Sequence, residues 1–457
     1  MKAQPTVTSL ARLTWPIFVE MLLHLLMGSL DVYMLSHYSS GAVAAVGIAN
    51  QIVQLFIMLF GFVAAGTTIV ISQELGAGLH RKAAAAARTA VTLNAVFGLL
   101  CSLALWSGAS LYLSWLGTPP ELMGDGLTYV RIVGGFLFLE AVMLTLSAIL
   151  RSHGLTRQVM YIGVGMNVVH VIGNYLVLYS PAGLPEFGIE GVAWSTVLSR
   201  VLGMTLMALV LITKLGSSSK TSRFWGMSGE YTGRLLRIGI PSTIEYLAYY
   251  VSQLCITSFI AGLGIKALTA RVFVDSTLGI VSLIATSIAI GTQIMIGHLI
   301  GGRRTAEAME RCMHGIRWSM IFGAAAAVLI AVEAEALLGF FTDDPVVIGW
   351  GTRLLWLMLL FQPAHSMCMV YQHVLKAVGD ANYPAVLGVL FMIGIRVPAA
   401  YVSIVYLDLG LLGVYASFVA DEWIRALLMR RRWRSRRWEV PALQREDLTE
   451  SIAARSS

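Results

Sequence analysis

Two carboxylates lie in an apolar stretch near the start of the chain, WPIFVEMLLHLLMGSLDVYML at residues 15–35. Glu20 and Asp31 are 11 residues apart. In an α-helix this separation is about three turns, so both side chains project from nearly one face. An ionisable group at membrane depth costs a few kcal/mol or more unless it faces a bundle interior or a wet cavity. We therefore expect this helix to line a pathway where an acid can bind and release a cation or a proton.

The composition of the chain predicts a membrane protein. Of its 457 residues, 57% are hydrophobic and 12% are charged, whereas about a quarter of the residues of a soluble domain are charged. The sequence therefore predicts an all-α integral membrane protein with twelve transmembrane helices. The apolar segments long enough to cross a bilayer lie near residues 13–37, 47–72, 87–113, 126–150, 157–180, 189–213, 238–262, 269–297, 312–340, 351–377, 383–407 and 410–430.

The basic residues indicate how the helices are oriented. Lysines and arginines fall in every second connection, and the opposite connections hold only Lys266, with Arg271 and Arg353 near helix ends. The positive-inside rule then predicts that both termini are cytoplasmic. The net charge of +7 is explained by this distribution, so we expect no nucleic-acid partner. We interpret the tail RRRWRSRRWEV as a topology anchor before a disordered polar end, with binding to anionic lipid head groups as the alternative.

Motifs for nucleotide-driven or zinc chemistry are missing. The sequence contains neither a phosphate-binding Gly-Lys-Ser/Thr loop nor a His-Glu-x-x-His helix, which are the usual signatures of ATP-driven pumps and zinc proteases. We therefore expect no cofactor, no metal and no enzymatic activity.

The chain contains an internal repeat. GTTIVISQELG at residues 66–76 returns as GTQIMIGHLIG at residues 291–301. Each half holds six spans, an even number, so the two repeats are parallel and should form two lobes around a cleft, the geometry of alternating access. The same offset pairs Pro16 with Pro241, Glu20 with Glu245, Leu150 with Leu375, Gly154 with Gly379 and Arg200 with Arg425.

The repeat also predicts the domain organisation. We expect an N-lobe over residues 1–213, a cytoplasmic linker over 214–237, a C-lobe over 238–430 and a basic cytoplasmic tail over 431–457.

The repeat distinguishes two kinds of acid in the spans. Glu20 and Glu245 are equivalent, which suggests a symmetric structural pair near a cytoplasmic gate, although an ion-binding role stays open. His24 lies one turn after Glu20 and is the hydrogen-bond partner that we expect for it. Asp31 has Ile256 as its counterpart. An acid present in one lobe only favours a specific task.

A polar stripe should lie near Asp31. Asn167, His170 and Asn174 occupy positions i, i+3 and i+7 of the fifth span, and therefore share one helix face. Such a stripe could hydrogen-bond a carboxylate and help it to hold or lose a proton. The alternative is a set of interhelical hydrogen bonds that only join helices.

Other polar residues are candidates for binding a cationic substrate or a second ion. Glu140 and its repeat counterpart His365 lie in mid-span, and Asp275 corresponds to Asn50. Arg396, in mid-span, must pair with an acid that the sequence does not identify.

Methionines inside the spans are weaker candidates. Met58 and Met166 offer soft side chains that suit a pocket for many apolar ligands, but they also suit lipid-compatible packing.

The ordered motifs resemble the multidrug and toxic compound extrusion (MATE) family. They are the helix from Pro16 to Asp31, the runs GAVAAVGIANQI and GTTIVISQELGAG, the stretch LRSHGLTRQVMYIGVGMNVVHVIGNYLV and VLKAVGDANYP. The similarity runs through all twelve spans. It implies a V-shaped pair of six-helix lobes and cation-coupled antiport of amphipathic, often cationic, organic compounds out of the cytoplasm.

The resemblance also implies roles for single residues. The coupling Asp of the family's first helix falls on Asp31, and an acid that some members use for sodium in helix seven falls near Glu245. Helix five lacks the second Asp of some proton-coupled members, and His365 stands about where sodium-coupled members have an acid. Proton coupling is favoured, with sodium as the alternative.

Two other functions fit these residues less well. A flippase for a lipid-linked or other amphipathic metabolite, from the same superfamily, should line its cavity with several basic residues, whereas the spans offer mainly Arg200 and Arg396. An intramembrane enzyme would need no internally repeated chain. We therefore expect an antiporter of small organic substrates in the bacterial cytoplasmic (inner) membrane, monomeric and surrounded by lipid, with no obligatory protein partner.

Overall fold

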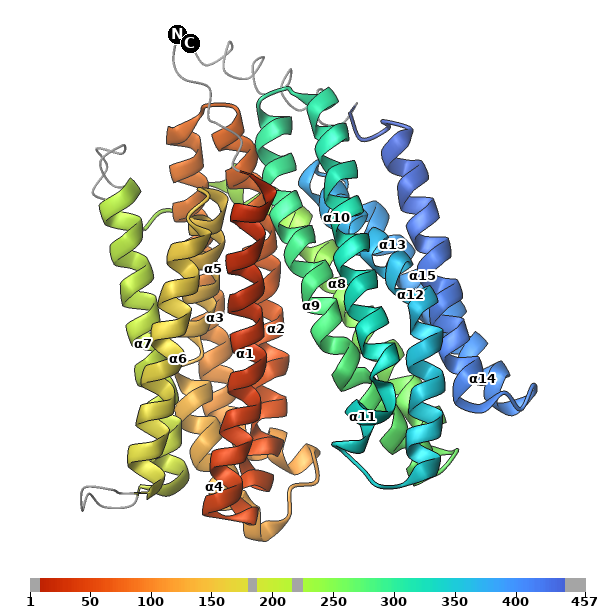
Figure 1. The fold of residues 1–457 in the computed structure, drawn as a ribbon. Helices are drawn as coiled ribbons and strands as arrows, with labels where there is room; N and C mark the ends of the chain where they lie inside the picture. The colour runs from red at the N-terminus through yellow and green to blue at the C-terminus, as the bar shows by residue number, and fades with distance from the viewer. Residues whose placement is uncertain (1–8, 180–186, 216–224, 440–457) are drawn as a thin grey trace, which may run out of the picture. The chain divides into compact units, whose positions relative to one another are not determined.

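The computed structural model describes residues 9–179, 187–215 and 225–439, which contain helices and no strand. In lipid, a helix satisfies its own backbone hydrogen bonds, and that favours this architecture in an apolar chain. The helices are α1 Leu10–Tyr38, α2 Ser40–Gly76, α3 His80–Trp115, α4 Pro120–Tyr129, η1 Val130–Gly134, α5 Phe138–Ser152, α6 Thr156–Tyr179, α7 Gly188–Leu215, α8 Gly229–Ala261, α9 Ile265–Gly301, α10 Thr305–Val332, α11 Ala334–Gly339, α12 Pro345–Ala377, α13 Asn382–Phe391, η3 Met392–Arg396, α14 Val397–Val405 and α15 Gly410–Arg434 (Figure 1).

These helices confirm the predicted multi-span membrane class. Within the described residues, nine are long and apolar enough to cross a membrane, and the bent pair α4–η1 and α5 raises the number to ten. Helices α8 and α15 occupy the other two predicted spans. They are more polar because α8 carries a run of tyrosines and α15 carries Asp421, Glu422 and Arg425.

The chain forms two compact units, which we call the N-unit and the C-unit. The N-unit is residues 15–239, and the C-unit contains the described residues of 1–14 and 240–457. Helices α1 and α8 therefore change unit beside the equivalent prolines, Pro16 and Pro241.

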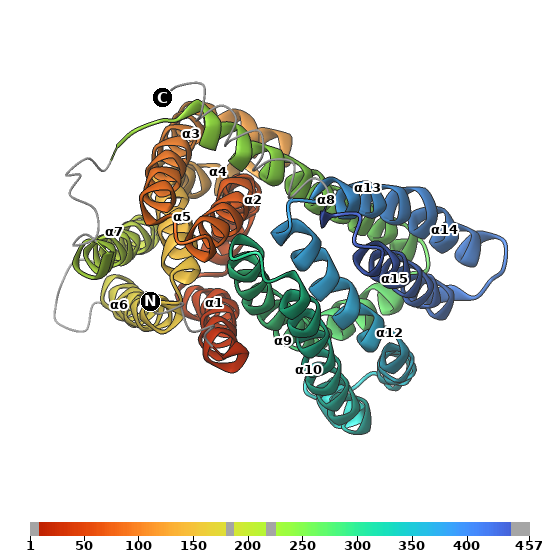
Figure 2. The same cartoon turned by 90° about the horizontal axis from the view of Figure 1, so that it is seen from above.

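The repeat places one helix at the centre of each unit. In the N-unit, α5 packs against α2, α3, α6 and α7. In the C-unit, α12 packs against α9, α10 and α15 (Figure 2). These central helices carry the equivalent residues Glu140 and His365. The turns that follow them contain Gly154 and Gly379, which have φ angles of 77° and 86°, a conformation that glycine adopts without a steric penalty.

The predicted linker and tail are partly helical. Helix α8 begins at Gly229, inside the predicted linker, and residues 216–224 lie outside the described residues. Helix α15 continues to Arg434, and the stacked rings of Trp433 and Trp438 are buried, with their centroids 4.6 Å apart. The first part of the basic tail therefore packs into the C-unit, while residues 440–457 lie outside the described residues.

Candidate functional site

Asp31 lies in a polar site formed by α1, α6 and α7 of the N-unit. Asn174 Nδ2 donates a hydrogen bond of 3.0 Å to Asp31 Oδ1, and His170 Nδ1 lies 3.7 Å from the same oxygen. The predicted approach of the helix-five stripe to Asp31 is confirmed for these two residues. Asn167 makes no hydrogen bond to Asp31 in the part of the chain that the structure describes. The Asp31 side chain is 32% exposed, against 11% for His170, so the site is accessible at the carboxylate.

Helix α7 fixes the ring of His170. His170 Nε2 lies 3.1 Å from the Thr196 hydroxyl oxygen, and that hydroxyl donates its hydrogen to the Val192 carbonyl at 3.0 Å. Because the Thr196 hydrogen is already used, Nε2 must carry the hydrogen of the neutral imidazole. The lone pair on His170 Nδ1 then faces Asp31.

This arrangement brings two hydrogen-bond acceptors together. An ionised carboxylate and an imidazole lone pair are both acceptors, and they repel each other at this distance unless a hydrogen lies between them. A proton on either Asp31 or His170 Nδ1 removes the repulsion. The geometry can therefore hold one exchangeable proton.

Glu140 and Arg200 lie beside this pair as a buried ion pair. Arg200 Nε is 3.1 Å from Glu140 Oε2, and both side chains are largely buried. Glu140 is thus neutralised within the N-unit, and its predicted role in substrate binding stays a prediction. With His170 neutral, Asp31 is the one acid of this group whose charge is not balanced.

The two methionine candidates are half-buried. Met166 packs with Met143 around Gly203 of α7, where an added Cβ would lie 2.8 Å and 3.1 Å from their sulfur atoms. This contact supports the packing interpretation for Met166. Met58 lies on α2, and its ligand role stays a prediction.

Glu20 and Glu245 form equivalent ion pairs. Glu20 pairs with Arg151, at the end of α5. Glu245 lies 2.7 Å from Lys376 Nζ, at the end of α12, and accepts a hydrogen bond from Gln372. Arg151 and Lys376 are themselves equivalent in the repeat, so the predicted symmetric pair extends to its partners. Glu20 takes Arg151 as its partner, and the predicted hydrogen bond to His24 is wrong.

The C-unit contains a charge cluster that the sequence predicted only in part. Arg396, in the π-helical turn η3, pairs with Asp421 and Glu422 of α15, and this answers which acids it binds. Arg425 binds the same two acids at 3.0 Å and 2.7 Å. His365 Nδ1 lies 3.6 Å from Glu422. Asp421 and Glu422 were not among the predicted site residues, although two adjacent acids before an arginine in the last span were a visible signal.

Asp275 is also held within the C-unit. Arg271 Nε lies 3.1 Å from Asp275 Oδ2, and the Tyr415 hydroxyl donates to Oδ1 at 2.8 Å. Glu245 and Asp275 share no partner among the described residues, and no metal-binding group of three or more His, Cys, Asp or Glu side chains occurs there. The structure therefore does not join these two acids into one site.

These features define a class of protein. Two repeats of six membrane spans, with one unbalanced acid beside a histidine in a single repeat, are features of a secondary transporter. The MatE family model matches residues 16–176 and 241–402. The chain belongs to the MatE family, and the two matched stretches begin at the equivalent prolines, Pro16 and Pro241, which confirms the repeat.

Individual relatives support the same assignment. The chain is 39% identical to the uncharacterized transporter YisQ of Bacillus subtilis over 94% of both chains. It is 25% identical to the probable multidrug resistance protein NorM of Thermotoga maritima, over 96% of this chain and 95% of the relative. A solved outward-facing conformation of a multidrug resistance MATE family transporter of the MOP superfamily matches with a TM-score of 0.87 at 20% identity, over 95% of this chain and 98% of that one. The protein is therefore a multi-span membrane transporter.

Proposed function

We propose that this transporter is an antiporter that exports amphipathic, often cationic, organic compounds in exchange for protons by alternating access. The observation that carries the proposal is the Asp31 site, where one unbalanced carboxylate faces His170 Nδ1 at 3.7 Å and accepts from Asn174. The name of the NorM relative, a probable multidrug resistance protein, supports the substrate class.

Competition for one negative charge would couple the two fluxes. When Asp31 is ionised, it attracts an organic cation in a low-dielectric surrounding, where a charge is worth more than in water. When a proton binds to the Asp31–His170 pair, the local charge falls to zero and the cation is released. Proton release on the other side of the membrane restores the site.

The setting of the transporter is part of the proposal. We place it in the bacterial cytoplasmic (inner) membrane, and its basic connections favour an orientation with both termini cytoplasmic. A monomer surrounded by lipid would suffice, because the coupling residues all lie in one unit. Sodium coupling through Glu245 and Asp275 is the alternative.

The test is ethidium efflux from proteoliposomes that contain the purified protein. A pH gradient and a sodium gradient are applied separately. We expect the pH gradient alone to drive efflux, and Asp31→Asn to reduce that efflux at least about tenfold, because the amide cannot bind the proton. Asp343→Asn is the control, an exposed acid of the other unit outside the candidate sites, and it should retain pH-driven efflux.

Two results would contradict the proposal. Efflux only with sodium would move the coupling ion away from Asp31, and unchanged pH-driven efflux in Asp31→Asn would remove its role. The flippase alternative receives less support, because Arg200 and Arg396, the arginines it would need, are each held by carboxylates.

A further inference from the structure

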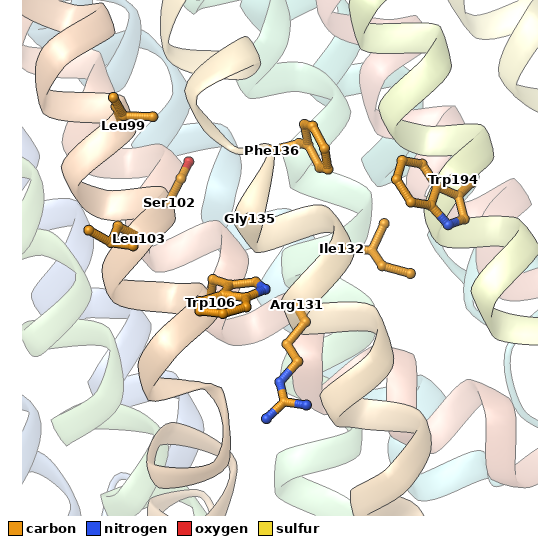
Figure 3. A pocket seen from close by; sticks show the side chains of 9 residues that line it. All are labelled: Leu99, Ser102, Leu103, Trp106, Arg131, Ile132, Gly135, Phe136 and Trp194. Carbon is orange, nitrogen blue, oxygen red and sulfur yellow. The ribbon is translucent and has the colours of Figure 1, made fainter.

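The N-unit has a groove that the transport site does not use. It has a volume of about 410 Å³ and lies where α3, the η1–α5 junction and α7 meet (Figure 3). Its walls include Leu99, Leu103, Trp106, Arg131, Phe136 and Trp194.

A bend in the fourth span creates this groove. The axes of α4–η1 and α5 differ by 42° across the break at residues 135–137. The Ser102 hydroxyl accepts a hydrogen bond of 2.8 Å from the Phe138 backbone N–H, which the break leaves without its helical partner. A Cβ at Gly135 would lie 3.4 Å from Trp106, an ordinary van der Waals contact, so the Trp106 ring packs closely on the bend. The groove is therefore a fixed feature of the packing.

The groove opens on a face that suits lipid. The exposed side chains of α3 near it are Val96, Leu99, Leu103 and Trp106, and an apolar exposed face on a membrane span contacts acyl chains. Arg131 is exposed in the same groove. A cation in this position requires an explanation.

No carboxylate of the described chain pairs with Arg131. It lies six residues after Asp125 on the same span, about 9 Å farther along the helix at 1.5 Å per residue. Arg200, Arg271, Arg396 and Arg425 all have carboxylate partners. A long arginine side chain on a lipid-facing surface extends its guanidinium toward the head groups, where it can meet an anion.

We propose that this groove binds an anionic phospholipid from the leaflet at the Pro120 end of α4. The Arg131 guanidinium donates two hydrogen bonds to the phosphate, and one acyl chain lies along Leu99 and Leu103. Trp106 lies beside the head group, as tryptophans do at membrane interfaces, and Trp194 packs on Phe136 with ring centroids 5.6 Å apart. The site belongs to one unit, since the repeat counterpart of Arg131 is Trp356.

The test is native mass spectrometry of the purified full chain with phosphatidylglycerol or phosphatidylcholine of identical acyl chains. We expect the wild type to bind the first phosphatidylglycerol about fivefold more tightly, from one arginine near the membrane surface. Arg131→Gln should remove the preference. Arg353→Gln is the matched control, because Arg353 is an exposed arginine on α12 outside the groove.

A second variant tests the role of the groove independently of the Arg131 charge. Leu103→Trp fills the groove and leaves Arg131 in place, and it should also weaken the first binding event by several-fold. Equal affinity of the wild type for both lipids would overturn the proposal, and so would a preference retained in Arg131→Gln or an unchanged affinity for phosphatidylglycerol in Leu103→Trp. The Leu103→Trp result decides the matter if Arg131→Gln does not fold.

Discussion

The N-unit and the C-unit are copies of one repeat. They share an equivalent glutamate ion pair, and they differ in whether their other acids are balanced by cations. Both contain a glutamate four residues after a proline, paired with a cation at the end of the central helix, as Glu20–Arg151 and Glu245–Lys376. Toward the C-terminal end of α1 the N-unit has a half-buried Asp31 with an unbalanced charge. The C-unit has Ile256 in its place, and a cluster in which Arg396 and Arg425 balance Asp421 and Glu422.

The two copies differ in whether their buried charges are balanced. The C-unit cluster is buried, and Arg425 and Asp421 have side chains that are 0% exposed. Its charges already cancel, so it gains nothing from an added cation. The Asp31 carboxylate is accessible and has no positively charged partner among the described residues. This contrast supports the proposal that ion coupling lies in the copy where the charges do not balance.

The largest expected effect is the loss of Arg425. Arg425→Ala leaves two buried carboxylates with one arginine, and breaking a buried pair costs about 3–5 kcal/mol. Thermal unfolding of the purified protein would measure this. Arg200→Ala, at a pair with more solvent exposure, should cost less. Equal unfolding temperatures for the two variants would contradict a closed structural cluster in the C-unit.

Replacing the equivalent glycines Gly66 and Gly291 by alanine should have a smaller effect on the free energy of unfolding, and one that differs between the two units. A Cβ at Gly66 would lie 2.7 Å from the backbone oxygen of Leu235, whereas at Gly291 it would meet the Thr14 hydroxyl at 2.7 Å. Backbone cannot move aside as a side chain can, so Gly66→Ala should destabilise by about 1–3 kcal/mol, and Gly291→Ala by less.

Gly47 provides the control for this pair on the same helix as Gly66. No atom lies within 4 Å of a Cβ at Gly47, so Gly47→Ala should be neutral or stabilising by up to about 1 kcal/mol. Chemical denaturation would rank the three variants, and a larger loss for Gly291→Ala would contradict the expected order.

Substitutions at the equivalent glutamates, Glu20 and Glu245, should differ by less in their effect on the free energy of unfolding. The whole Glu245 residue is 2% exposed, whereas the Glu20 side chain is 21% exposed. Glu245→Gln leaves Lys376 buried without its partner, so it should destabilise more than Glu20→Gln, by about 1 kcal/mol. Matched melting curves test this, and equal losses would indicate that both pairs are equally screened by solvent.

The smallest expected effect on stability is at the N-caps of the equivalent helices α4 and α12. Helix α4 follows Pro119, which offers no side-chain cap, whereas α12 follows Asp344, which accepts from the Val346 N–H at 2.9 Å. The hydrogen bond from Lys266 and this cap bond hold the pKa of Asp344 below its usual value of 3.8. A lowered pKa in the folded state adds stability above about pH 3.8, and this stability is lost as the pH falls through the folded pKa.

The corresponding variant is Asp344→Asn, which keeps a cap oxygen and removes the charge. It should lower the melting temperature slightly at pH 6, and the difference from wild type should vanish at low pH. Asp343→Asn, at the adjacent exposed acid, is the control. A difference that does not shrink as the pH falls below 3.8 would show that the charge is not its cause.

Much of the candidate site could be predicted because helix periodicity fixes which residues share a face. Asn174 and His170 were expected beside Asp31 on that basis, and they lie there. The expected partner of Glu20 was wrong because His24, one turn away, competes with the longer Arg151 that reaches from another helix. Periodicity within one helix carries no information about such a competition.

The sequence by itself determined the membrane class, the helical spans and the twofold repeat, because lipid requires long apolar helices and a fixed offset between the two halves is visible in the letters. It also determined that Asp31 is unmatched in the other copy. Only the tertiary structure decided that Arg200 balances Glu140, that Arg396 binds Asp421 and that Thr196 orients His170. These choices depend on how each helix is rotated against its neighbours, and that rotation is set by the packing of all side chains together.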